Sequence, residues 1–70
     1  MRTAINIAPF VQPDRTTLFR YTVEFKGHLS INEAARRAEQ IIRASSRLDH
    51  TERGYLLNCM EIGNYEHDLT

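Results

Sequence analysis

Residues 17–26, TLFRYTVEFK, decide the fold. Apolar side chains occupy the odd positions from 19 to 25, and polar or charged side chains occupy the even positions between them. A period of two with aromatic and β-branched residues is typical of a strand that has one buried face. This strand therefore needs a partner strand at its side and an apolar layer over one face, and Gly27 ends it.

Residues 3–8 supply the partner strand, because Ile5 and Ile7 again fall on one face of an alternating segment. We expect the two strands to pair antiparallel, with residues 9–16 as the hairpin loop. Pro9 and Pro13 lie in that loop, and a proline cannot donate a hydrogen bond to a strand ladder. The stretch between them is therefore a loop or the end of an edge strand.

Residues 31–47 predict an amphipathic helix. Ser30 and Glu33 form the pattern of a capping box at its start. Apolar residues then recur at spacings of three and four, which places them on one face of a helix. The outward positions carry an excess of arginine, and Arg36, Arg43 and Arg47 lie on one side of the predicted helix.

Residues 50–62 allow two interpretations. A helix is indicated by Asp49 and Glu52, which match a second capping box, and by Gly63, which matches a C-terminal stop. A strand is indicated by the apolar run that follows Gly54, since glycine inside a helix costs about 1 kcal/mol relative to alanine. We favour the helix, and the strand would give the order β-β-α-β.

These elements predict a small α+β domain over residues 1–63. An antiparallel hairpin packs on the first helix, and the element at 50–62 completes the core. We expect residues 64–70 to form a polar, acidic tail, because they continue none of the apolar patterns.

Size and charge limit the function. The chain has 70 residues and a formal net charge of zero, which argues against a strongly basic nucleic-acid or membrane-surface protein. The neutrality is a cancellation, since residues 51–70 are acidic and the rest is mildly basic. A domain this small is marginally stable, and Cys59, the single cysteine, allows no internal disulfide. A partner chain is therefore an attractive source of extra stability.

The residues that could carry chemistry do not form a recognised site. His28, His50, Cys59, His67 and Asp68 lack the short paired spacing of zinc ligands, so we predict no metal and no cofactor. A nucleophile at Cys59 would need a base such as His50 beside it, and apolar neighbours lower the reactivity of a thiol. We therefore predict a protein that is not an enzyme.

The most economical interpretation is a protein-interaction module that binds a larger protein or a nucleoprotein complex, or a second copy of itself. Compact chains without chemistry are common among phage and mobile-element proteins, including inhibitors of nucleases and of CRISPR complexes. Opposed charges speed and orient such binding. The candidate contact residues lie in the acidic C-terminal part, at Glu61, Tyr65, Glu66 and Asp68.

The alternative is a small dimeric nucleic-acid-binding protein. Its phosphate contacts would come from Arg36, Arg43 and Arg47 on the predicted helix 31–47.

No apolar stretch that would make a signal peptide follows Met1. No run of apolar residues is long enough to span a membrane, so we expect a cytoplasmic protein without a membrane partner.

Overall fold

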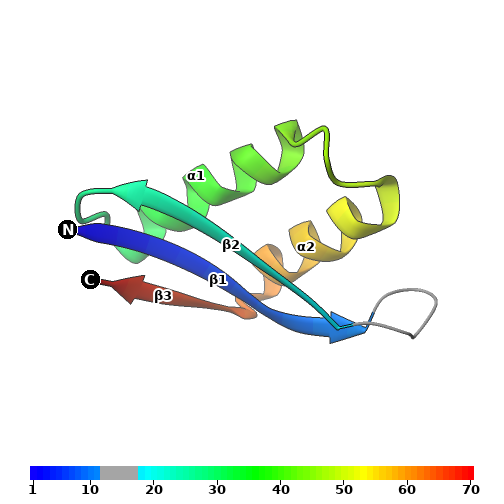
Figure 1. The fold of residues 1–70 in the computed structure, drawn as a ribbon, viewed down its shortest axis with the longest axis horizontal. Coiled ribbons are helices and arrows are strands. Elements are labelled where there is room, and N and C mark those ends of the chain that lie inside the picture. The colour runs from blue at the N-terminus through cyan, green and yellow to red at the C-terminus, as the bar shows by residue number, and fades with distance from the viewer. Residues whose placement is uncertain (12–17) are drawn as a thin grey trace.

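The computed structural model describes residues 1–11 and 18–70, which form a three-stranded antiparallel sheet and two helices (Figure 1). In chain order the elements are β1 (Arg2–Val11), β2 (Leu18–Lys26), α1 (Ile31–Ala44), α2 (His50–Ile62) and β3 (Tyr65–Leu69). The predicted α+β class is confirmed, with an antiparallel pair of strands followed by helices.

β1 lies in the centre of the sheet, between β2 and β3. Ile5 stands opposite Val23 on β2 and His67 on β3, so these three residues share one face. Both helices pack on this inner face, and Figure 1 shows them together on one side of the strands. The buried core consists of Ile5, Ile7, Val23, Ala34, Ala38, Ile42, Leu48, Leu56 and Cys59.

β1 is longer than the sequence indicated, because it continues to Val11. Its pairing with β2 changes register between Ile7 and Phe10, and its pairing with β3 stops at Ile7. Pro9 therefore lies where β1 has a strand on one side only, which is where a sheet tolerates proline. Of the expected loop at 9–16, the part from residue 12 onward lies outside the described residues.

α1 begins at the predicted cap, where the Ser30 hydroxyl accepts a hydrogen bond from the Glu33 amide at 3.2 Å. The Glu33 carboxylate accepts a bond from Arg37 at 3.0 Å and does not turn back to the cap. The predicted end at residue 47 is wrong: α1 stops at Ala44, because Ser45 adopts an extended backbone, and Arg47 lies in a turn.

α2 settles the ambiguity at 50–62 in favour of a helix. The Asp49 carboxylate accepts from the Glu52 amide at 2.7 Å, and the Glu52 carboxylate accepts from the Asp49 amide at 3.1 Å. Gly63 ends the helix with a φ of 78°, a left-handed conformation that glycine adopts without strain. Arg53 stabilises the segment between α1 and α2, because its guanidinium donates to the carbonyl oxygens of Leu48 and Ser45.

The prediction of a tail at 64–70 is wrong, because Tyr65–Leu69 forms β3 and pairs with β1. Arg2 and Thr70 extend the pairing by exchanging two backbone hydrogen bonds of 2.9 Å. The alternation of apolar and polar residues along β3 is hard to recognise in the sequence, because His67, its central inward residue, is polar. The His67 ring is accommodated there since Nε2 lies 3.0 Å from the Leu29 carbonyl oxygen.

Thr3 ties the sheet to the segment that leads into α1. Its side chain is fully buried. The hydroxyl donates to the Gly27 carbonyl at 2.7 Å and accepts from the Leu29 amide at 2.8 Å. One side chain thus satisfies a backbone acceptor and a backbone donor of the segment that connects β2 to α1.

We predict that Thr3→Val lowers the free energy of unfolding by about 1–3 kcal/mol, because valine keeps the shape but leaves the Leu29 amide without its acceptor. Chemical denaturation measures the change. Thr22→Val is the matched control, since the Thr22 hydroxyl bonds Asn6 on the exposed face of the sheet. A loss at Thr3 no larger than the loss at Thr22 would contradict this role.

Candidate functional site: a hollow between the two helices

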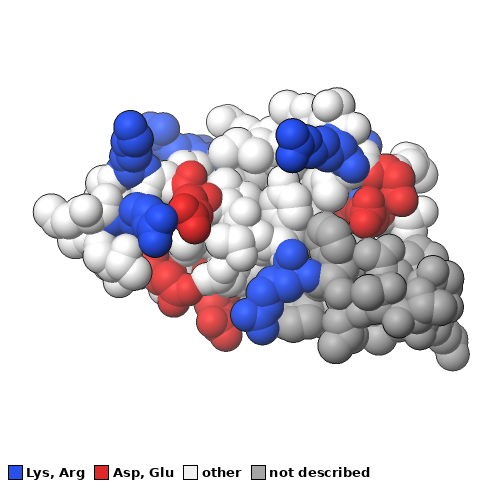
Figure 2. All heavy atoms as spheres, viewed as in Figure 1, with Lys and Arg blue, Asp and Glu red and all other residues white. Residues whose placement is uncertain are grey.

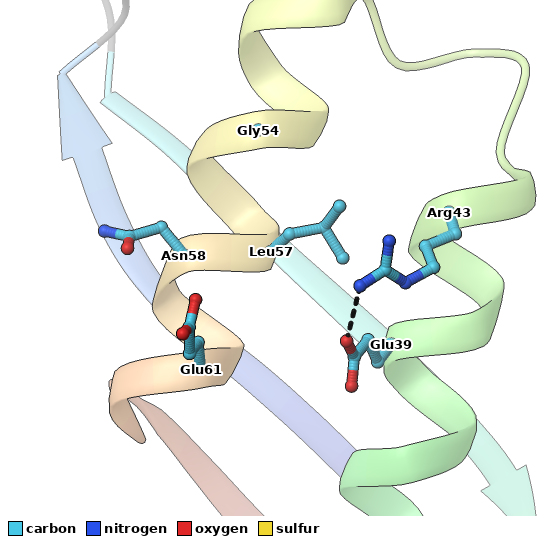
Figure 3. Close-up of a pocket in the computed structure, with 6 residues that line it drawn as sticks. All are labelled: Glu39, Arg43, Gly54, Leu57, Asn58 and Glu61. Carbon is cyan, nitrogen blue, oxygen red and sulfur yellow. Dashed lines mark hydrogen bonds and ion pairs between the residues drawn. The ribbon is translucent and has the colours of Figure 1, made fainter.

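α1 and α2 lie side by side with a hollow of about 620 Å³ between them, open to solvent. Figure 3 shows side chains from both helices around it. Two lining residues come from α1 and four from α2. They are Glu39, Arg43, Gly54, Leu57, Asn58 and Glu61. The members on each helix are spaced one, three or four residues apart, which keeps them on one side of that helix.

Gly54 leaves one wall of the hollow without a side chain. It lies inside α2, and a Cβ atom added there would meet nothing within 4 Å. Its backbone is not left-handed, unlike that of Gly27 and Gly63. Neither conformation nor internal packing therefore requires a glycine at this position, although glycine costs a helix interior about 1 kcal/mol relative to alanine.

The hollow combines charge with an apolar wall. Arg43 donates to Glu39 at 2.9 Å, an exposed pair that contributes little to stability. Within the described part of the chain, no residue pairs with Glu61. Leu57 is half-buried between the helices, and Figure 3 shows its side chain extending toward Arg43. Two carboxylates and one guanidinium give the hollow a net negative charge.

The four candidate contact residues from the acidic C-terminal part of the chain do not form one surface. Glu61 lines the hollow. Tyr65 is half-buried on the inner face of β3, opposite Ile7. Glu66 and Asp68 fall on the outer face of the sheet, because side chains alternate along β3. The structure thus places the four residues on three different surfaces.

The arginine candidates are also separated. Arg43 lines the hollow and is paired with Glu39, whereas Arg36 is exposed on α1. Arg47 follows the end of α1, so the three do not form a stripe on one helix. The structure instead brings Arg43 and Glu61, from the two predicted sets, to the same hollow.

The outer face of the sheet is polar and internally bonded. Asn6 accepts from the Thr22 hydroxyl at 2.6 Å and donates to Asp68, which links all three strands. Arg2 pairs with Glu24 at 3.0 Å on the same face. In Figure 2, acidic and basic residues are interspersed over the side in view, without a patch of one sign.

The structure does not assemble a nucleophile around Cys59. The side chain is 2% exposed and belongs to the core. His50 is exposed at the opposite end of α2, nine residues earlier, which is about 13 Å along a helix axis. Asp49 is occupied as the helix cap. Over residues 1–11 and 18–70, no three histidine, cysteine or carboxylate side chains gather as a metal site would require.

Neither helix of the described chain has the length and apolar character needed to cross a membrane. Comparisons with protein-family models, with curated proteins and with solved structures gave no match.

In the sequence alone, Gly54 favours a strand over a helix, and no pattern relates Leu57 or Asn58 to Arg43. Only the antiparallel placement of the two helices makes these residues neighbours. The signal available in the sequence was the glycine inside a segment that is well capped at both ends.

We predict that Gly54→Ala raises the free energy of unfolding by about 1 kcal/mol, because alanine restricts the unfolded chain and fits the open wall. Gly63→Ala is the matched control and should lower it by about 1–2 kcal/mol, since φ at Gly63 is 78°. Thermal or urea denaturation of both variants gives the comparison. A loss of stability at Gly54 would mean that the helix needs the glycine for its own packing.

Proposed function

We propose that this chain is a non-catalytic binding module, and that a segment of a larger protein or nucleoprotein complex seats in the hollow between α1 and α2. The observation that carries the proposal is Gly54. A glycine inside a helix is usually explained by a left-handed backbone or by close packing, and neither exists at this position. The absence of a side chain at this open position would allow a group from outside the chain to approach the backbone closely.

The lining of the hollow favours a basic, partly apolar segment. A lysine or arginine of the partner can lay its aliphatic stem on Leu57 and place its charge beside Glu61. Among the described residues Glu61 makes no ion pair, and Arg43 is paired with Glu39, so such a pair would form without breaking an existing one. A volume of about 620 Å³ holds a few side chains of a docking segment.

A protein partner fits this site better than a nucleic acid. Phosphates would be repelled by Glu39 and Glu61, and Arg43 is already paired with Glu39. Arg36 and Arg47 remain as contacts outside the hollow, which is a small basic surface on a chain of zero net charge. A non-catalytic role is supported by the burial of Cys59 and by its separation from His50.

The test begins with affinity capture from the native host, followed by purification of the retained protein and calorimetric titration. Gly54→Trp should weaken binding at least tenfold, because an indole would occupy the hollow. Gln40→Trp places the same side chain on the exposed side of α1 and should leave the affinity unchanged. Glu61→Lys should weaken binding strongly, whereas Glu66→Lys makes the same charge change on the outer sheet face and should not.

Equal affinities of the Gly54→Trp variant and the wild type would contradict the proposal, as would the retention of no protein. If capture depends on nucleic acid and falls steeply with salt, the alternative function is correct. The Arg36→Ala, Arg47→Ala double variant would then lose binding, although its hollow is intact.

A further inference from the structure

β2 has a strand on one side only, and its other edge is free along the residues that the structure describes. The Gly27 amide donates to the Met1 carbonyl at 3.1 Å, which marks these two residues as a hydrogen-bonded pair. Because such pairs alternate along an antiparallel ladder, the odd residues of β2 direct their backbone groups to β1. The even residues, among them Thr22 and Glu24, direct theirs to the free edge.

This edge carries few of the features that usually prevent edge-to-edge pairing. The segment 18–26 contains no proline and no glycine, and the register shift is accommodated in β1. The charged side chains along this edge are Arg20, Glu24 and Lys26, so their signs alternate along the strand. All three are exposed on the outer face of the sheet. Ordered charges of both signs select a pairing register as well as opposing the wrong ones.

We propose that the partner at this edge is a second copy of the chain, joined antiparallel through β2 with Thr22 opposite Thr22 of the second copy. Counting outward from that pair places Arg20 opposite Glu24 of the second copy, and the two-fold symmetry repeats the contact. Both are even positions, so they form hydrogen-bonded pairs at the free edge. On the inner face, Tyr21 falls opposite Val23 of the second copy.

Charge complementarity selects this register over its neighbours. A shift of two residues places Arg20 opposite Lys26 in one direction and opposite Thr22, with no ion pair, in the other. A shift of four places Glu24 or Arg20 opposite itself. A shift of one residue would set even residues opposite odd ones, whose backbone groups are already bonded to β1, so the ladder could not form. The Glu24 carboxylate is already held on the outer face by Arg2 at 3.0 Å, and its second oxygen can accept from Arg20 of the second copy.

The pairing would produce a continuous six-stranded sheet in the order β3-β1-β2-β2-β1-β3. An antiparallel two-fold axis stands perpendicular to the sheet, so all four helices lie on one face. Tyr21 and Phe25 are only partly buried on the inner face of the edge strand, and the second copy would add cover beside them. Such a dimer provides stability that a 70-residue core lacks.

The first test is molecular mass by sedimentation equilibrium over a range of concentrations, with circular dichroism to confirm folding. The wild type should reach twice 8.2 kDa. Arg20→Glu sets glutamate against Glu24 at both symmetric contacts and should raise the dissociation constant about tenfold or more. The Arg20→Glu, Glu24→Arg double variant restores opposite charges and should recover dimerisation, whereas Lys26→Glu, the control, should leave it unchanged.

The second test is specific for the register. Thr22→Cys places two thiols across the two-fold axis at a Cα separation of about 5.5 Å, which a disulfide can bridge. Lys26→Cys has no thiol opposite it and should not cross-link, and the native Cys59 is buried. A wild type that stays monomeric at every concentration overturns the proposal and leaves the edge for a strand of another protein. An unchanged dissociation constant for the Arg20→Glu variant also overturns the proposal. Equal cross-linking of the Thr22→Cys and Lys26→Cys variants overturns it as well.

Discussion

The structure depends on β1 being bonded along both of its edges. Its odd residues pair with β2 and its even residues pair with β3, and the odd side chains, Thr3, Ile5 and Ile7, are fully buried under the helices. The same alternation therefore fixes the backbone pairing and the inner face at once. Without β3, the amides of Ala4 and Asn6 would lose their acceptors, and the sheet would be a two-stranded hairpin stabilised only by its packing on the helices.

Because both helices cover the inner face, the molecule presents three distinct surfaces. The outer sheet face is bonded to itself through Asn6, the hollow lies between the helices, and the two edges of the sheet belong to β2 and β3. The hollow and the β2 edge are formed by separate elements, so the proposed partner segment and the proposed second copy would not compete for the same residues. In the proposed dimer both hollows would open on the same side, which suits a partner that is itself repeated or symmetric.

The sequence predicted the parts of the fold that local chemistry determines. Alternation identified β2, and the Asp49–Glu52 pair with Gly63 identified both ends of α2. β3 could not be found in this way, because His67 is polar and its inward position is satisfied by the Leu29 carbonyl, which is distant in the chain. For the same reason Glu61 was a candidate while the hollow was not: its walls exist only once α1 and α2 pack side by side. Arg47 was misplaced because Ser45 ends the helix before it.

Amide hydrogen exchange of the wild type, followed residue by residue by NMR, tests the central position of β1 most directly. The account predicts strong protection of Thr3, Ile5 and Ile7, whose amides face β2, and equal protection of Ala4 and Asn6, whose amides face β3. Protection of the odd residues with free exchange at Ala4 and Asn6 would show that β3 is not paired, and it would contradict the account.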